Sequence, residues 1–148
     1  MKILNRRARR DYQILETFEA GVSLLGAEAR ALRDGRGDIN AAYGRIKDNE
    51  AYLIGANIPA HITTSVKDYD PLRTRKLLLH RRELLALGTK IKQQNLNLIP
   101  LSVYNKGPLV KVQLALAKSK KQFEKKEAKK RRDIAREAEI EARGKWRV

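Results

Sequence analysis

The sequence predicts a mainly β fold with small helices, in which short strands close, or nearly close, into a barrel. Two observations lead to this prediction. Segments rich in β-branched and aromatic residues recur through residues 11–117 and are separated by Gly, Pro, Asn and Asp. Segments with helical periodicity are few and short, and the regular alternation of strands and helices that is typical of parallel α/β folds is absent.

The first part of the chain predicts an arm, two strands and a helix. Residues 1–10 hold five basic side chains and no acid, which predicts a basic arm. Residues 11–25 show the alternation of strands, and Ala20-Gly21 favours a break between two of them. Residues 26–34 favour a short helix because alanine and leucine dominate them, and Asp34-Gly35 is typical of a helix end.

The middle of the chain predicts a hairpin followed by a polar loop. Residues 39–46 and 51–58 carry side chains that suit a half-buried sheet, and residues 48–50 supply the turn. Pro59 ends the second strand, and residues 61–69 form the loop.

Residues 70–82, with the sequence DPLRTRKLLLHRR, place three leucines between two basic clusters. A buried leucine contributes about 1.5 to 3 kcal/mol, so we expect the leucines to anchor this segment to a core while the basic groups stay outside. Guanidinium groups held on a fixed scaffold suit phosphate recognition. A strand or helix edge with solvated charges explains this segment alone equally well. A helix is predicted from about residue 81 to 94, with Leu84, Leu85, Leu87 and Ile91 on its buried side.

The last predicted strands cover residues 96–105 and 109–117, with a turn at residues 105–108. Pro100 prefers an edge or a bulge. Six short strands with two small helices fit a barrel of the oligonucleotide-binding kind better than a sandwich. The second strand alternates cleanly, which predicts Val110, Val112, Leu114 and Leu116 inside and Lys111, Gln113 and Ala115 outside.

The charge balance indicates a polyanionic partner. The chain has 33 basic and 17 acidic residues, a formal net charge of +16, which is more than solubility needs. No apolar run has the length of a membrane span, and no leucine-rich or aromatic face lies opposite a lysine face, so nucleic acid is favoured over a membrane. Residues 1–10 then either lie along a phosphate backbone or fray in isolation.

Several kinds of chemistry are absent from the sequence. It has no cysteine, and its two histidines, His61 and His80, are too few for a zinc site. It has no glycine-rich phosphate loop, and nothing calls for a cofactor. An RNA-cleaving enzyme with His80 as base is an alternative, but a lone histidine is more often a hydrogen-bonding residue than a catalyst. We therefore expect no enzymatic activity.

The composition changes at residue 118. Residues 118–148 hold 13 basic and six acidic residues, and their large apolar side chains form no continuous stripe that could dock on a barrel. We predict three parts: a basic arm over residues 1–10, an RNA-binding barrel over 11–117, and a basic tail over 118–148. The tail is expected to be disordered when free and helical when bound to RNA. A merely solvated tail is the alternative.

Several motifs together resemble one family: SmpB, the small protein B that binds transfer-messenger RNA in bacterial trans-translation. The long run DPLRTRKLLLH at residues 70–80 is the most specific of them. The others follow in the family's order between Asn5 and about Arg132. They are NRRA at 5–8, FEAG at 18–21, GAEARALR at 26–33, GANI at 55–58 and LALAKSKK at 114–121.

The resemblance implies an oligonucleotide-binding-like barrel that holds the tRNA-like domain of transfer-messenger RNA. Leu78 can pack against an unstacked base, and His80 can stack on or hydrogen-bond to a base or ribose. Glu19 must accept hydrogen bonds from base amino groups or 2′-hydroxyls, or hold a neighbouring arginine in place. The predicted RNA-binding set is Glu19, Arg73, Arg75, Lys76, Leu78 and His80.

The family's tail implies contacts with the decoding centre and the mRNA path of the small ribosomal subunit. Its lysines would neutralise the RNA backbone, and Phe123 would offer a stacking plane. Here Ser119 replaces the usual Gly, Glu124 stands where Asp is customary, and Phe123 where His or Tyr is commoner, but charge and aromatic plane are kept. The predicted tail set is Lys118, Lys120, Lys121, Phe123, Lys125 and Lys126.

The function implied is delivery of alanyl-charged transfer-messenger RNA to stalled ribosomes, which rescues them and tags nascent chains for degradation. The implied partners are that RNA, small-subunit ribosomal RNA and, through the RNA, elongation factor Tu and alanyl-tRNA synthetase. We expect a monomer in the bacterial cytoplasm. The alternative is a general ribosome-associated RNA-binding protein with the same barrel, which needs no chemistry in the tail.

Overall fold

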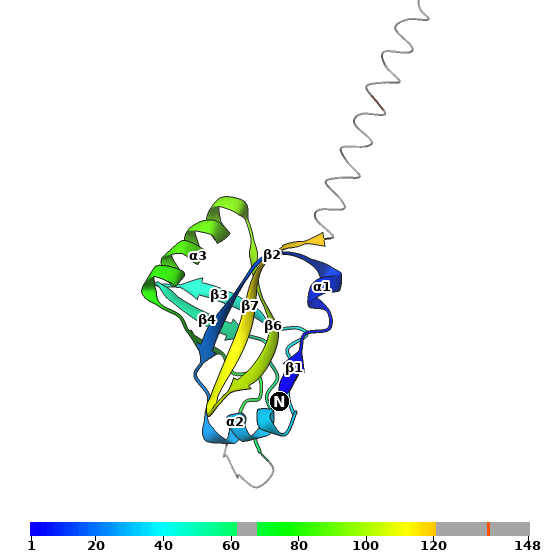
Figure 1. Cartoon of the computed structure of the whole chain (residues 1–148), viewed down its shortest axis with the longest axis vertical. Helices are drawn as coiled ribbons and strands as arrows, with labels where there is room; N and C mark the ends of the chain where they lie inside the picture. Colours follow the sequence, from blue (N-terminus) through cyan, green and yellow to red (C-terminus); the bar gives the residue numbers. More distant parts are fainter. Residues whose placement is uncertain (62–67, 121–135, 137–148) are drawn as a thin grey trace, which may run out of the picture.

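Antiparallel strands make up most of the structure, a computed structural model that describes residues 1–61, 68–120 and 136 (Figure 1). Among these residues, the helices are α1 (Ala8–Asp11), α2 (Gly26–Arg33) and α3 (Arg81–Gln94). The strands are β1 (Lys2–Leu4), β2 (Tyr12–Val22), β3 (Tyr43–Lys47), β4 (Glu50–Ile54), β5 (Arg75–Leu78), β6 (Asn97–Lys106) and β7 (Leu109–Ser119).

The sheet closes on itself. Its strand order is β1-β6-β3-β4-β5-β2-β7, and β7 also pairs with β6, so that β2 to β7 form a ring and β1 is added at β6. The pairings within this sheet are antiparallel. The predicted mainly β fold is confirmed, and the ring of pairings is what closing a sheet into a barrel requires.

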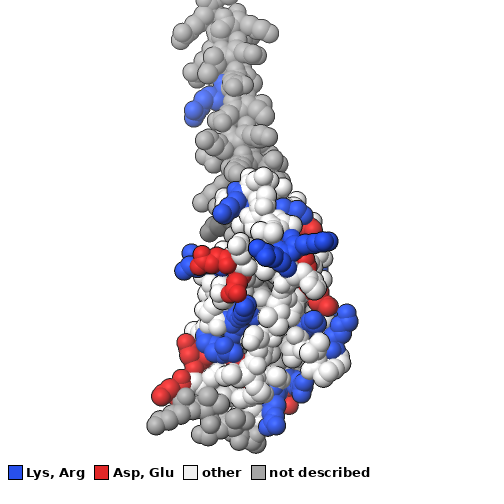
Figure 2. Space-filling view, turned by 90° about the vertical axis from the view of Figure 1, so that its left-hand side faces the viewer, with Lys and Arg blue, Asp and Glu red and all other residues white. Residues whose placement is uncertain are grey.

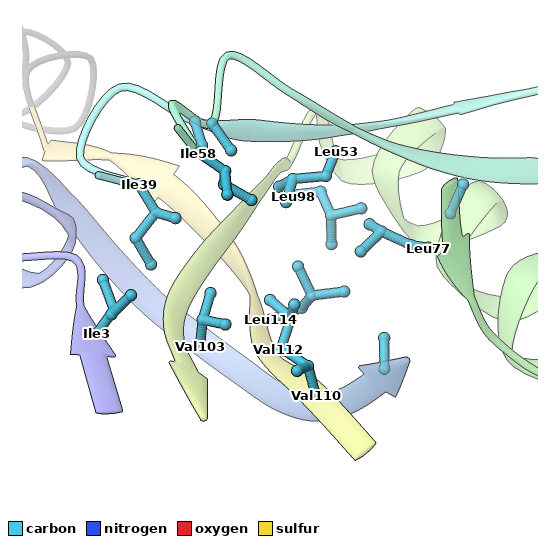
Figure 3. Packing of buried hydrophobic residues seen from close by; sticks show 14 of the residues in the cluster. Ile3, Ile39, Leu53, Ile58, Leu77, Leu98, Val103, Val110, Val112 and Leu114 are labelled. Carbon is cyan, nitrogen blue, oxygen red and sulfur yellow. The ribbon is translucent and has the colours of Figure 1, made fainter. Parts of the chain in front are cut away.

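The core fills the inside of this ring. Leu53, Leu77, Leu98, Val112 and Leu114 converge from β4, β5, β6 and β7 (Figure 3), and each is at most 3% exposed. These four leucines and one valine therefore tie strands from all around the ring to one apolar centre. The inward side chains predicted for β7, namely Val110, Val112, Leu114 and Leu116, are confirmed.

Ala115 points away from the main core, as predicted, but it is not exposed. Ala115 is fully buried in a second cluster with Ala8, Ile99, Leu101 and Ala117. Period-two alternation assigns Ala115 to the outer face of β7, but it does not tell whether another element covers that face. Here α1, with the fully buried Ala8, supplies part of the cover.

The first ten residues are docked, which differs from a free basic arm. Residues 2–4 pair with β6, and Ile3 is only 9% exposed. Asn5 then fixes the start of α1: its Oδ1 accepts from the amides of Arg7 and Ala8, and its Nδ2 donates to the Pro100 carbonyl at 2.8 Å. The docking of this segment is hard to predict from the sequence. Among residues 1–10 only Ile3, Asn5 and Ala8 are buried, and five of the others are basic.

The break expected at Ala20-Gly21 is also wrong, because β2 is one continuous strand. Gly21 pairs with Leu78 of β5, and a Cβ at Gly21 would lie 3.1 Å from the Leu78 Cβ. The glycine therefore serves a close approach between strands rather than a turn. The irregularity in β2 lies earlier, where the register with β7 shifts between Ile14 and Glu16.

The predicted helices and the hairpin are confirmed with small shifts. Helix α2 ends beside Gly35, which has φ +76°, and α3 covers the predicted residues 81–94. Leu85, however, is 53% exposed rather than buried. The hairpin strands β3 and β4 are shorter than predicted, and Asp48 and Asn49 form their turn with positive φ angles.

At the carboxyl end, β7 continues past the predicted boundary at residue 117. Lys118 pairs with Gln13, and the Lys120 Nζ donates to the Arg9 carbonyl at 2.7 Å. The conformation predicted for the tail falls on residues 121–148, which lie outside the described residues apart from Arg136. None of the described helices combines the length and the apolar character needed to cross a membrane.

Candidate nucleic-acid interface

Three residues of the predicted RNA-binding set meet in one hollow. Glu19 from β2, Leu78 from β5 and His80 before α3 line a depression of about 570 Å³. Leu109 and Lys111 at the start of β7 complete the same wall. These residues are separated by up to 92 positions in the sequence, from Glu19 to Lys111, so closure of the sheet is what assembles this surface.

The local register explains why Leu78 faces the hollow. In β5, Leu77 is 2% exposed and Leu78 is 53% exposed, because successive side chains of a strand point to opposite faces. Gly21 opposes both Leu78 of β5 and Lys111 of β7, so no side chain from β2 stands between them. The result is an exposed apolar side chain beside a charged amine.

His80 lies between β5, which ends at Leu78, and α3, whose N-cap residue it is. Its backbone amide donates to Glu83 Oε1 at 3.3 Å, which ties the first turn of the helix to the strand that carries Leu78. His80 is exposed. Its imidazole therefore lies at the rim of the hollow, where it can reach a bound base or ribose.

Glu19 is an exposed carboxylate that is already held by two donors. The Tyr104 hydroxyl donates to Glu19 Oε2, and Lys106 Nζ lies 3.5 Å from Glu19 Oε1. The hydrogen bond from Tyr104 lowers the pKa of Glu19, partial burial opposes this shift, and Lys106 adds to it. The carboxylate is therefore ionised at neutral pH and oriented, although the partner we expect is a polyanion.

The arginines of the predicted set have a different role, and the RNA contact predicted for Arg75 is wrong. The Arg75 side chain is fully buried: its Nε donates to Glu28 Oε2 at 2.7 Å and its Nη1 to the Ala56 carbonyl at 2.9 Å. Arg73 donates to the same carboxylate and is 32% exposed. Arg75 cannot contact RNA from this position, because all its donors point inward.

Glu28 of α2 is the centre of this buried cluster. Burial opposes ionisation of Glu28, but hydrogen bonds from Arg73, the Leu25 amide, Tyr69 and Arg75 outweigh it and lower the pKa to about 2. The cluster joins α2 to the residues that lead into β5. It therefore holds the strand that carries Leu78 and leads to His80.

Lys76 lies on the same outer face of β5 as Leu78 but outside the hollow. Its Nζ is paired with Glu50 Oε1 at 2.9 Å, and Glu50 also accepts from the Tyr52 hydroxyl at 2.8 Å. The predicted tail residue Lys118 is exposed at the far end of β7. Seven residues at about 3.4 Å each separate it from Lys111, so it lies about 24 Å from the hollow. Lys121, Phe123, Lys125 and Lys126 lie outside the described residues.

Four residues of this region were not predicted from the sequence as site residues: Tyr104, Lys106, Leu109 and Lys111. The alternation in residues 109–117 did place Lys111 outside. What was missing was the pairing of β7 with β2 on one side and with β6 on the other, which brings this end of the strands next to Glu19. The turn predicted at residues 105–108 could have indicated part of this arrangement. It makes the two flanking strands antiparallel neighbours, which places residues 104 and 106 close to residues 109 and 111.

The remaining surface is basic without forming one uniform patch. On the face that carries α3, Lys and Arg side chains are spread out and acidic side chains lie among them (Figure 2). The described residues contain no group of three side chains suited to a metal ion. A basic surface of this kind suits general attraction to a polyanion.

Comparison with known proteins identifies the family. The model of the SmpB protein family matches residues 2–144, a longer span than the motifs alone indicate. The SsrA-binding protein of Gloeobacter violaceus is 46% identical over 135 residues, covering 91% of this chain and 89% of that protein. The SsrA-binding protein of Sulfurihydrogenibium sp. is 43% identical over 144 residues, covering 97% and 95%.

A solved structure supports the same assignment. A chain of the structure described as "tmRNA-SmpB: a journey to the center of the bacterial ribosome" matches with a TM-score of 0.67 and 44% identity, over 80% of this chain and 83% of that one. Sequence and fold agree over most of the chain. The protein therefore belongs to the SmpB family.

Proposed function

We propose that this protein binds the tRNA-like part of transfer-messenger RNA and delivers it to stalled ribosomes for trans-translation. Its membership of the SmpB family and its similarity to SsrA-binding proteins support this function. The observation that carries it is the hollow, in which an exposed leucine, an exposed imidazole and an oriented carboxylate meet. RNA recognition favours unstacked bases and ribose hydroxyls, which these three groups suit.

The role of the protein in this proposal is binding without catalysis. Leu78 packs against an unstacked base, His80 stacks on or hydrogen-bonds to its neighbour, and Glu19 accepts from donors of the RNA. Arg73 and Arg75 act from behind this surface by fixing β5. The bacterial cytoplasm, where ribosomes work, is the expected location, and elongation factor Tu and alanyl-tRNA synthetase are expected to act through the RNA.

Binding by the full chain to transfer-messenger RNA, with tRNA as competitor, tests the proposal at two salt concentrations. Phosphate contacts alone lose affinity steeply as salt rises, whereas contacts in the hollow persist. We expect Leu78→Ala to lower the affinity for transfer-messenger RNA about tenfold, since it removes an apolar contact. Leu72→Ala is the matched control, because Leu72 is equally exposed, at 55% against 53%, and lies outside the hollow.

The outcomes separate three possible functions of the chain. A preference for transfer-messenger RNA that survives high salt and falls only in Leu78→Ala supports the proposal. Binding without preference, equally salt-sensitive in all three proteins, would mean a general basic RNA-binding protein. Turnover of RNA that is lost in His80→Ala while binding remains would instead support the RNA-cleaving alternative.

We propose further that residues 118–148 contact the small ribosomal subunit at the decoding centre and the mRNA path. Their strong basic charge and their place in the family match support this role. Because β7 extends to Ser119 and Lys120 contacts Arg9, a truncation should end after Lys120 rather than after Ala117. We expect the truncated chain to keep its preference for transfer-messenger RNA and to lose tagging on stalled ribosomes. Tagging at the full level would contradict the proposed tail role.

A further inference from the structure

Glu19 belongs to a cluster that crosses three neighbouring strands. It lies on β2, opposite Gln113 of β7, and β7 in turn pairs with β6, which carries Tyr104 and Lys106. Tyr104 donates its hydroxyl to one carboxylate oxygen of Glu19, and Lys106 lies near the other. Glu19 itself lines the hollow, whereas Tyr104 and Lys106 do not. These two residues therefore reach the RNA site only through Glu19.

The two donors differ in how firmly they are held. Tyr104 is half-buried within β6, where it opposes Lys111, whereas the Lys106 side chain is 70% exposed. Burial and the bond to Glu19 raise the pKa of Tyr104 to about 12. The hydroxyl therefore keeps its proton at every physiological pH. Tyr104 is a fixed donor, and Lys106 a mobile one.

Orientation leaves Glu19 able to accept further hydrogen bonds. A carboxylate has about four lone-pair sites, and each oxygen of Glu19 uses one for its partner. The side chain is still 37% exposed. The free sites can accept only from donors, and a phosphate backbone offers none. Base amino and imino groups and the ribose 2′-hydroxyl are the RNA groups that fit.

We propose that Tyr104 is a positioning residue for RNA selection: it aims the Glu19 carboxylate so that it accepts from base and ribose donors and repels misplaced phosphates. This inference rests on the proposed function, since it takes the hollow as the RNA site. On this proposal, Glu19 adds little to the affinity for RNA and mainly discriminates between correct and wrong RNA. A correct RNA places donors at the carboxylate, whereas a wrong one places a phosphate there and incurs repulsion.

The test is a comparison of full-length variants in binding to transfer-messenger RNA and to tRNA. We expect Tyr104→Phe to lower the preference for transfer-messenger RNA about fivefold, as loss of one orienting hydrogen bond predicts. Tyr52→Phe is the matched control. It removes a hydroxyl that likewise donates to an exposed glutamate beside a lysine, Glu50 and Lys76, but away from the hollow. Glu19→Gln should lower the preference at least as much as Tyr104→Phe.

The pH profile separates positioning from a structural role. Without the Tyr104 hydroxyl the pKa of Glu19 rises, so its carboxylate takes up a proton at higher pH. The preference of Tyr104→Phe should therefore decline at a higher pH than that of the unmodified chain as pH is lowered from 7 to 4. The preference of Glu19→Gln should lack this step altogether.

The outcomes are distinguishable. If Glu19→Gln loses preference while Tyr104→Phe matches Tyr52→Phe in preference and pH profile, the inference is overturned and the proposed function stands. If the unmodified chain shows no preference, both fail. If Tyr104→Phe does not fold, Lys106→Gln decides, because its exposed side chain carries no folding role. We expect about a twofold loss and a smaller pH shift in the same direction for this variant, because Lys106 also lowers the pKa of Glu19, and an unchanged profile would overturn the inference.

Discussion

The two glutamate clusters of this protein use the same chemistry in opposite environments. Glu19 is exposed and receives a tyrosine hydroxyl and a lysine, whereas Glu28 is fully buried and receives a tyrosine hydroxyl and two arginines. Tyr69 to Glu28 Oε2 measures 2.8 Å, and Arg75 Nη2 lies 2.6 Å from the same oxygen. Both carboxylates are ionised, but only one has lone pairs that a ligand can reach.

The difference shows that burial decides what such a cluster does. All the acceptor sites of Glu28 face protein donors, so its hydrogen bonds and ion pairs stabilise the folded chain. Glu19 keeps free acceptor sites at the wall of the hollow, so it can accept hydrogen bonds from a ligand. The buried cluster holds β5 in place. In the proposed function, the exposed cluster discriminates among RNA groups that bind in the hollow beside β5 and β7.

The largest expected effect comes from breaking the buried cluster. Glu28→Gln leaves Arg73 and Arg75 without their counter-charge, and Arg75 is fully buried. Breaking such a pair costs about 3 to 5 kcal/mol in free energy of unfolding. Urea unfolding of the full chain measures this loss. Glu50→Gln is the control, because Glu50 has similar partners but is exposed, and we expect a far smaller change. Equal losses in the two variants would contradict the contrast.

Acid should reveal the same cluster in the unmodified chain. The pKa of Glu28 falls from an ordinary 4.5 to about 2 on folding, so the stability that it contributes is complete above about pH 4.5 and is lost as pH falls toward 2. A shift of this size corresponds to about 3 kcal/mol. Urea midpoints measured from pH 6 to pH 2 test this, and Glu28→Gln should lack that share of the acid dependence. An equally steep decline in the variant would assign the acid loss to other groups.

A smaller effect separates the two arginines that share Glu28. Arg75 donates to five acceptors, namely Glu28 Oε2, Ala56 O, Arg73 O, Tyr69 Oη and Pro71 O. A lysine has three donors and no planar fork, so Arg75→Lys should cost about 2 to 3 kcal/mol in free energy of unfolding. Arg73→Lys should cost less than half of that, because Arg73 is partly exposed. Thermal unfolding of both variants measures the difference. A larger loss of stability for Arg73→Lys would contradict the view that Arg75 contributes more to the fold than Arg73.

The sequence predicted the class of the fold better than it predicted these roles. Turn residues and alternation located most strands, and the helix at 81–94 agrees with α3, because both signals are local. They could not tell that β2 continues through Gly21, because that glycine makes room for Leu78 of another strand. They also could not tell that Arg75 is buried, because an arginine between basic residues resembles a surface residue until its acceptors are known.

The site was predicted in part for the same reason. The resemblance to the family singled out Glu19, Leu78 and His80, and the structure brings these three into one hollow. Tyr104 and Lys106 were missed because their relation to Glu19 passes across β7 and depends on register. Long-range register is set by the closed sheet as a whole, and no local pattern contains it.

The smallest expected change in stability belongs to Glu19→Gln, and it sharpens the comparison most. Glu19 is exposed, Lys106 can turn to water when the charge is removed, and the glutamine amide oxygen can still accept from the Tyr104 hydroxyl. The urea midpoint of this variant should therefore stay close to that of the unmodified chain. Its preference for transfer-messenger RNA over tRNA should fall, whereas the Arg73→Lys variant should show the reverse, with lower stability and the preference kept. A matching loss of stability in Glu19→Gln would mean that both glutamates serve the fold, and that exposure alone does not release a carboxylate for recognition.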